Sequence, residues 1–354
     1  MRAVPVETNR IRSAWEGRIS GCVLGKPVEV LSFQEGRAGL YAYLEETDAL
    51  PLRDYVPLIE GTLVDKLGRA CCEGHISRAE PDDDINYTVL ALLLLESKGI
   101  DFDTADVARM WLRLLPAGTT WTAERAAYAT LLSNMADEFV NGEAPGFDIT
   151  ECSDNEYNEW IGAQIRADLY GWVCPGRPAL AADLARRDAS LSHRSEGVHG
   201  AAFVAALGAA IPASATLDEA LDAALEQIPG DSDTAGAVQL ARRLAARNDA
   251  VEQLHITYRD LPPVHTINNL AVVVWALCSA EDDFSAAIGN AVTAGWDTDC
   301  NAATVGGLFG LRGSRIPDKW TQPWAGRIGL SLAGYQELHI DDVVQRTVAT
   351  ARSM

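Results

Sequence analysis

Apolar residues recur every three or four positions through most of this chain of 354 residues, and that spacing restricts the folds open to it. Residues 181–187 and 217–228 show the pattern clearly and are rich in residue types that favour helices, such as Ala, Leu, Arg and Glu. Alternation of apolar and polar residues with a period of two, which is typical of strands, is scarce. The sequence therefore predicts an all-α fold.

Short loops are expected to separate the helices. Residues 101–106 supply caps and acidic residues for a helix that continues to Leu115. No long Ser- or Gly-rich linker interrupts the chain, so a single domain over residues 1–354 is favoured. Residues 32–57 contain two glycines and many aromatic and acidic residues, and they are expected to form a long loop or lid.

Acidic residues strongly outnumber basic ones. The chain has 50 acidic and 29 basic residues, a formal net charge of −21, which makes a nucleic acid or an anionic membrane an unfavourable partner. The same acidic excess suits a cation site. An anionic substrate would be repelled unless bound divalent metals or an Arg cluster reversed the charge in the cleft.

The cysteines and the apolar runs bear on the cellular compartment. The seven cysteines are an odd number without C-x-x-C spacing, which indicates free thiols in a reducing environment. The N-terminus lacks the apolar segment of a signal peptide, and the longest apolar runs, residues 89–95 and 270–278, are too short to cross a bilayer. We therefore expect a soluble cytoplasmic protein.

Two acidic clusters stand at expected helix starts. Three aspartates at 82–84 precede the apolar residues 89–95, and Asp297 and Asp299 precede a helix of small residues. Carboxylates at a helix N-terminus often act only as caps. Three in a row repel one another, however, and a divalent cation with oxygen ligands would compensate. Facing each other in a helical bundle, the two clusters could form a two-metal site.

A third segment has regularly spaced glycines. Gly17, Gly21 and Gly25 recur every four residues, and Pro27 and Glu29 follow. Taken alone, this spacing indicates a helix with a stripe of small residues that another element can approach closely. Glu29 would then be an ordinary solvated acid.

Together the three segments resemble the signatures of the ADP-ribosylglycohydrolases, also called the dinitrogenase-reductase-activating glycohydrolase family. Residues 21–29 are similar to the family's Gly-Asp-Ala-Leu-Gly-x-Pro-x-Glu segment. Residues 82–85 are similar to its Thr-Asp-Asp-Thr segment, and residues 295–300 to its Gly-Gly-Asp-Thr-Asp-Thr segment. All three occur in the family's order. The similarity extends from about Gly17 to Trp320, which implies a family-like core over about residues 11–330.

The resemblance implies a multi-helix bundle with two Mg²⁺ ions, or Mn²⁺, at its centre. Carried over by position, the metal ligands would be Asp82, Asp83, Asp84, Asp297, Asp299 and Cys300. Asp82 and Cys300 stand where the family usually has threonine. Glu29 matches a glutamate beside the metals and the substrate ribose, and Glu29, Asp83 and Asp299 are the predicted catalytic residues.

The implied activity is metal-dependent hydrolysis of an N- or O-glycosidic bond to ribose, with ADP-ribosylated substrates expected first. Such cleavage passes through an oxocarbenium-like state, and Glu29 or a metal-bound hydroxide would act as the base. The resemblance also implies a small-molecule or ADP-ribosylated substrate as the partner. The oligomeric state is not predicted.

Three departures from the family pattern point to a divergent subgroup. Cys300 offers a soft sulfur that Mg²⁺ does not prefer, so either it is not a ligand or the metal differs. Asp82 would restore the missing oxygen and charge. Cys22 replaces an acid that the family commonly carries near the site.

Two residues are candidates for substrate contact. His193 lies at a loop-to-helix junction where the family often has a His, although a capping histidine is the default. Trp121 could stack on a base, although a core tryptophan is the default.

Other polar residues are read as structural. Residues 155–171 are expected to form a surface helix with Arg166 and Asp168 in ion pairs, or else to place Gln164 or Arg166 at the pocket. Asn268 and Asn269 are expected to form structural hydrogen bonds. The segment 231–234 copies the Asp-x-Asp pattern and is read as a helix cap.

Three alternatives stay open. The chain could be a non-catalytic ADP-ribose-binding or structural member of the family, or a glycosidase acting on a nucleoside-like metabolite. Metal-assisted phosphoester hydrolysis is more remote, because two-metal carboxylate sites also serve that chemistry.

Overall fold

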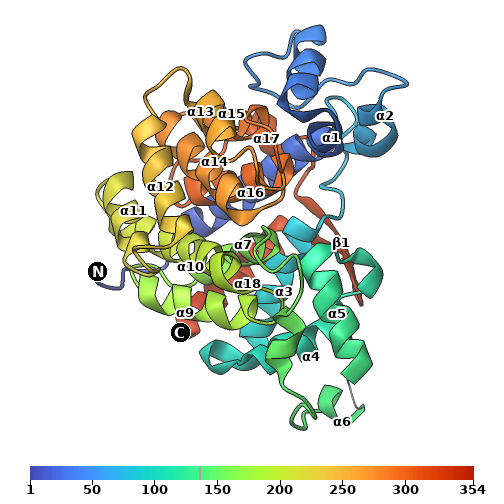
Figure 1. Cartoon of the computed structure of the whole chain (residues 1–354), viewed down its shortest axis with the longest axis vertical. Coiled ribbons are helices and arrows are strands. Elements are labelled where there is room, and N and C mark those ends of the chain that lie inside the picture. Colours follow the sequence, from blue (N-terminus) through green and yellow to red (C-terminus); the bar gives the residue numbers. More distant parts are fainter. Residues whose placement is uncertain (135–136) are drawn as a thin grey trace.

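A computed structural model describes residues 1–134 and 137–354 (Figure 1). Helices dominate, and two short strands form one antiparallel hairpin, so the predicted all-α fold is confirmed apart from this hairpin. In chain order the elements are α1 (Thr8–Glu46), α2 (Leu63–Gly68), α3 (Asp83–Lys98), α4 (Thr104–Leu114), α5 (Thr122–Asn134), α6 (Asp137–Val140), α7 (Gly162–Arg166), α8 (Asp168–Trp172), α9 (Pro178–Ala189), α10 (Ser195–Ala210), α11 (Leu217–Leu225), α12 (Asp233–Leu244), α13 (Ala250–Thr257), α14 (Thr266–Ser279), α15 (Phe284–Thr293), α16 (Thr298–Gly310), α17 (Asp318–Thr321), β1 (Arg327–Leu332), β2 (Tyr335–His339) and α18 (Ile340–Ser353).

Helices α1 and α16 pack against each other with their backbones in close contact (Figure 1). A Cβ atom at Gly21 would lie 2.0 Å from the carbonyl oxygen of Ala302, and one at Gly25 would lie 2.4 Å from the amide nitrogen of Asp299. Real Cβ atoms cannot approach that closely, so glycine is required at this interface. The stripe of glycines therefore brings the first motif directly against the third.

Helix α1 is longer than expected. It continues to Glu46 with a break at Gly36, whose φ of 65° and ψ of −170° are not helical. The predicted loop or lid over residues 32–57 is therefore wrong for its first half. The reason is a set of buried residues at helical spacing beyond the break, which the glycines and acids obscured: Leu40, Tyr43 and Leu44.

The expected helices at the second acidic segment and after it are confirmed. Helix α3 begins at Asp83 and carries the apolar run to the core. Helix α4 begins after Asp103, which forms a capping box with Asp106, and ends at Leu114.

The prediction of a surface helix over residues 155–171 is wrong. The structure has the short helices α7 and α8 in this region, and both Arg166 and Asp168 are buried. They are tolerated in the interior because each has oppositely charged partners from other elements. The ion pairs were expected, but their burial was not.

Helix α10 lies in the core. With the turn after it, residues 195–213 are long and apolar enough to cross a membrane by length and composition alone, with a mean hydropathy of 1.3. This segment is longer than residues 89–95 and 270–278, which the sequence indicated as the longest apolar runs. Of this window 72% is buried inside the protein, as in a core helix.

Candidate metal centre

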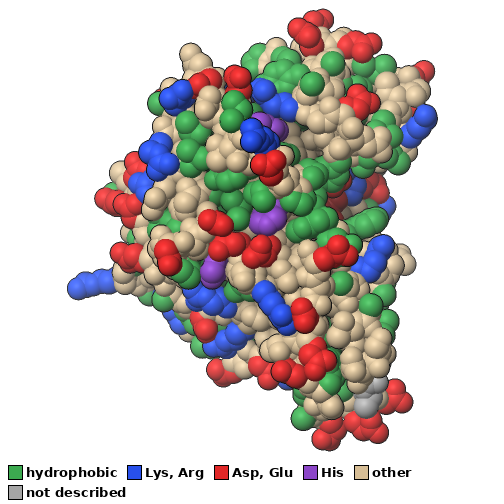
Figure 2. All heavy atoms as spheres, viewed as in Figure 1, with side chains coloured by type: hydrophobic (Ala, Val, Ile, Leu, Met, Phe, Trp, Pro, Cys, Tyr) green, Lys and Arg blue, Asp and Glu red, His purple; other side chains and the backbone are tan. Residues whose placement is uncertain are grey.

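A cavity of about 560 Å³ brings together the segments that carry the three motifs. Its wall includes Glu29 from α1, Asp83 from α3 and Cys300 from α16. Trp121 and Trp160 line its apolar side. Figure 2 shows acidic side chains in a hollow bordered by hydrophobic ones, between the part of the molecule with α1 and α2 and the part with α3 and α5.

Three groups of side chains beside this cavity are close enough to hold a cation. In each group the ligand atoms lie within 4.8 Å of one another. The groups are Glu29 with Asp297 and Asp299, Asp84 with Asp299 and Cys300, and Cys22 with Asp82 and Asp84. Asp83 lines the cavity but belongs to none of the groups found among the described residues.

The two helix starts use their first aspartates differently. Oδ1 of Asp82 accepts a hydrogen bond of 2.9 Å from the amide of Asp84, so Asp82 caps α3. Asp297 stands at the same position before α16, yet its side chain caps no amide in the described part of the chain. Its Oδ1 is buried without a hydrogen-bond partner among the described residues. Asp297 therefore keeps an oxygen free for a ligand.

Burial and mutual repulsion disfavour the ionised form of the carboxylates in this centre. Burial, with repulsion from Asp297, raises the pKa of Glu29 well above its usual value. Burial, with repulsion from Glu29, does the same to the pKa of Asp299. Burial also raises the pKa of Asp84 well above its usual value, against the attraction of Arg18. A divalent cation would relieve this repulsion, so the residues present fit such an ion.

Lys26 is a residue of the site that the sequence interpretation missed. Its ammonium group donates hydrogen bonds to Oδ2 of Asp82 and, at 2.9 Å, to the carbonyl oxygen of Pro81. Although burial acts to raise the pKa of Asp82, Lys26 holds it below its usual value. Lys26 lies in the first motif, three residues before Glu29 and so near it on the helix, which could have identified it.

Arg18 is a second missed residue. Its guanidinium is fully buried and lies 3.0 Å from Oδ1 of Asp84 and 2.8 Å from Oδ2 of Asp168. It also donates to the backbone carbonyl of Asp84 at 2.9 Å. Arg18 therefore holds the start of α3 in place behind the cavity. Its spacing of four residues from Cys22 places both on one face of α1.

Comparison with known proteins identifies the family. A sequence model of the ADP-ribosylglycohydrolases matches residues 4–350, nearly the whole chain. The chain belongs to the ADP-ribosylglycohydrolase family. Among solved structures, one described as an "ADP-ribosylglycohydrolase-related protein complex" is 20% identical, with a TM-score of 0.56. The match covers 98% of this chain and 100% of that one, and at this identity it concerns the fold. No curated protein matches the sequence.

In this member of the family, Trp121 is not a core residue. Its side chain is 56% exposed at the cavity, and the guanidinium of Arg125 lies 5.0 Å from the centre of its ring. The default reading of a core tryptophan is therefore wrong. The exposed face leaves the predicted contact with substrate open to test.

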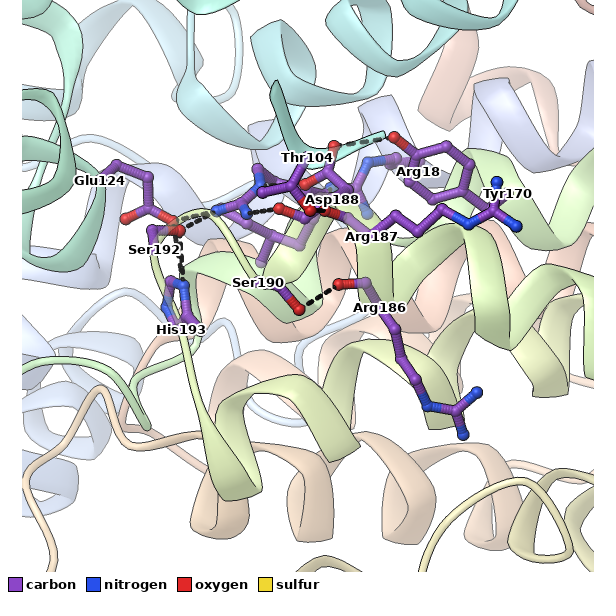
Figure 3. A network of polar contacts seen from close by, with 12 residues as sticks. Arg18, Thr104, Glu124, Tyr170, Arg186, Arg187, Asp188, Ser190, Ser192 and His193 are labelled. Atoms are coloured by element: carbon purple, nitrogen blue, oxygen red, sulfur yellow. Dashed lines mark hydrogen bonds and ion pairs between the residues drawn. The ribbon is translucent and has the colours of Figure 1, made fainter. Parts of the chain in front are cut away.

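His193 lies in a buried polar network behind the cavity wall (Figure 3). Its Nδ1 is 2.8 Å from Oγ of Ser192, which accepts a hydrogen bond of 3.1 Å from Arg166. Arg166 in turn pairs with Glu124 at 2.5 Å and with Asp188 at 2.6 Å. Glu124 reaches the cavity, whereas His193 is not among its described lining residues. Substrate contact by His193 stays a prediction that this position does not support.

The expected structural roles of Asn269 and of the segment 231–234 are confirmed. Oδ1 of Asn269 accepts a hydrogen bond of 3.2 Å from the amide of Asp297, so Asn269 supports the loop of the third motif. Ser232 caps α12 through a hydrogen bond from Ala235, so the second Asp-x-Asp pattern is a helix start. All seven cysteines, which lie within the described residues, are free.

Proposed function

We propose that this ADP-ribosylglycohydrolase family member is a divalent-metal-dependent hydrolase that cleaves a glycosidic bond to ribose in ADP-ribose-type substrates. One observation carries the proposal. The carboxylates of Glu29, Asp297 and Asp299 come within 4.8 Å of one another beside a cavity large enough for a substrate, and an oxygen of Asp297 has no hydrogen-bond partner in the part of the chain that the structure describes.

The residues have distinct tasks in this proposal. Asp297 and Asp299 would hold the ions together with Asp84, and Asn269 and Arg18 keep those aspartates in place. Bound ions would supply positive charge next to the ribose hydroxyls and favour ionisation of water. Glu29 presents its carboxylate to the cavity, where it can accept a proton from water that attacks the anomeric carbon.

The aromatic side of the cavity supports a planar group in the substrate. Trp121 is exposed at the wall, and Trp160 packs edge-on against Tyr157 with ring centres 4.7 Å apart. A base or nicotinamide-like ring can stack on such an indole face. The ribose would then extend from the tryptophans toward the carboxylates.

A second candidate is a glycosidase for a nucleoside-like metabolite, and the charge of the cavity favours it. Among the described residues of the lining, Lys26 is the only basic one, and it is paired with Asp82. A diphosphate would therefore depend on the metal ions and on backbone amides for compensation. An uncharged ribosyl compound needs none.

The test is turnover with a defined metal content. Protein treated with a chelator is assayed with and without Mg²⁺ or Mn²⁺ on ADP-ribosylated protein, ADP-ribosyl small molecules and nucleosides. We expect metal-dependent release of the ribosyl product, and Asp297→Asn and Asp83→Asn should abolish it. Asp233→Asn, at the exposed copy of the motif on α12, is the matched control and should retain activity.

The other outcomes identify the alternatives. Full turnover in the presence of chelator would contradict the proposal. Calorimetric binding of ADP-ribose without hydrolysis of any ribosylated substrate would indicate a non-catalytic binding member. Release of phosphate from nucleotides would indicate phosphoester hydrolysis.

A further inference from the structure

The candidate metal centre has two chemically different corners. Glu29, Asp297 and Asp299 offer only oxygen atoms, which suit Mg²⁺ or Mn²⁺. The neighbouring group of Asp84, Asp299 and Cys300 adds a sulfur atom, and its ligand atoms also lie within 4.8 Å of one another. The two groups share Asp299, so they are adjacent positions of one centre.

Asp84 has an oxygen available in the sulfur-containing corner. The side chain is fully buried, and its Oδ1 pairs with Arg18 at 3.0 Å. Its Oδ2 is also buried but has no hydrogen-bond partner in the described part of the chain. A buried carboxylate oxygen without a partner is costly, and a cation would satisfy it.

Cys300 is placed to share that cation. It lies in the first turn of α16, faces the cavity and is only 6% exposed. Close contact between Gly25 and the backbone at Asp299 brings this turn against α1. The thiol therefore lies at the cavity, within 4.8 Å of a carboxylate oxygen of Asp84 and one of Asp299.

A second thiol nearby provides a comparison. Cys22 groups with Asp82 and Asp84, but both oxygens of Asp82 already accept hydrogen bonds, from Lys26 and from the amide of Asp84. This group therefore has fewer free ligand atoms than the group of Cys300. Cys22 serves as the internal control.

We propose that Asp84, Asp299 and Cys300 bind a thiophilic divalent cation of the Zn²⁺, Co²⁺ or Fe²⁺ class, next to an all-oxygen position for Mg²⁺ or Mn²⁺. The inference concerns the site of the proposed function and rests on that function. Sulfur ligands select these ions over Mg²⁺. Cys300 binds as a thiolate, so each bound ion releases one proton from the thiol to solvent.

Cobalt gives an optical test that needs no turnover. Metal-free full-length protein is titrated with Co²⁺ in the presence of Mg²⁺, which is colourless and fills the all-oxygen position. We expect a near-ultraviolet thiolate-to-Co²⁺ charge-transfer band that saturates at one ion per chain. Cys300→Ser should lose this band, and Cys22→Ser should retain it.

A competition experiment measures the preference itself. The ratio of Zn²⁺ to Mg²⁺ affinity is compared in the wild type and in Cys300→Thr, which restores the hydroxyl usual in the family. We expect the ratio to fall at least ~10-fold, because even changes to residues that only orient metal ligands cost about 10- to 100-fold in metal affinity. Circular dichroism of both Cys300 variants checks that they fold, and the two substitutions make the result independent of either one.

Two results would overturn the inference: a saturated wild type without the band, or a band that persists in folded Cys300→Ser. The outcomes separate this inference from the proposed function. A band that depends on Cys300 in a protein without ribosyl hydrolysis supports the metal assignment while the function fails. Metal-dependent hydrolysis without the band supports the proposed function and contradicts the metal assignment.

Discussion

Nη2 of Arg18 lies 3.0 Å from Oδ1 of Asp84, and neither side chain is exposed. Nη1 of the same guanidinium lies 2.8 Å from Asp168, so one buried cation joins two buried carboxylates from different helices. A charge left without a partner in the interior is costly. The stability of the fold and the position of a candidate metal ligand therefore depend on the same residue.

Replacing Arg18 by Met should strongly destabilise the protein. The substitution leaves Asp84 and Asp168 buried without their cation, and breaking a buried pair in this way costs about 3–5 kcal/mol. Urea unfolding of the metal-free protein measures the effect. Arg12→Met, on the same helix, removes an exposed pair with Asp341 and should cost less than about 1 kcal/mol. Equal losses in both variants would contradict the prediction.

Asp168 should make the stability depend on pH. Burial raises the pKa of Asp168 to about 6, against the attraction of Arg18, from an ordinary value of 3.8. Between these two pH values the folded state binds more protons than the unfolded state, so stability falls as pH rises from about 4 to about 6 and then levels off. At about 1.4 kcal/mol per pKa unit, the contribution is about 3 kcal/mol.

The variant Asp168→Asn isolates that contribution. It keeps the shape of the side chain but cannot titrate, so its unfolding free energy should vary less over this range than that of the wild type. Denaturant unfolding at several pH values gives both curves, and the difference in slope is the quantity to compare. Identical slopes would show that Asp168 does not titrate as described.

The contact between α1 and α16 should not tolerate a methyl group. Gly21→Ala places a Cβ atom 2.0 Å from the carbonyl oxygen of Ala302, so the helices must separate. We expect a loss of more than about 2 kcal/mol in the free energy of unfolding, with weaker metal binding, because overpacking shifts backbone as well as side chains. Thermal and urea unfolding measure the loss.

Gly236→Ala is the control for this change. Gly236 is an exposed residue of α12, and a Cβ atom there would meet nothing within 4 Å. Alanine is favoured over glycine inside a helix, so this variant should gain about 0.5–1 kcal/mol. If Gly236→Ala also destabilised the protein, the loss in Gly21→Ala could not be assigned to the close contact between α1 and α16.

Trp121→Ala should weaken substrate binding without unfolding the protein. The indole is 56% exposed at the cavity wall, so its removal leaves no buried hole, and the melting temperature should hardly change. Loss of stacking worth about 1–1.5 kcal/mol would raise KM about 10-fold. Leu132→Ala, at an exposed position of α5, should leave KM unchanged. An unchanged KM in Trp121→Ala would exclude the stacking contact.

The sequence was sufficient for the fold class and the family. Helical spacing of apolar residues predicts the helices wherever glycines and acids do not interrupt it, and it failed at residues 32–57, where Gly36 breaks α1 and conceals its second half. The three motifs identify the family because all of them occur in the family's order, and that combination is more specific than any single motif. The buried position of Arg166 could not be predicted, because its partners Glu124 and Asp188 lie elsewhere in the chain.

What the sequence determined alone is local: where helices start, which carboxylates precede them, and where glycine permits close contact. Only the tertiary structure decided which of those carboxylates keep a free oxygen. Asp82 and Asp297 both precede a helix, yet the oxygens of Asp82 are taken by its own cap and by Lys26, whereas one oxygen of Asp297 has no partner among the described residues. The physical reason is that hydrogen bonds and ion pairs between distant segments form only when packing brings them together, and they determine which polar atoms remain free for a ligand.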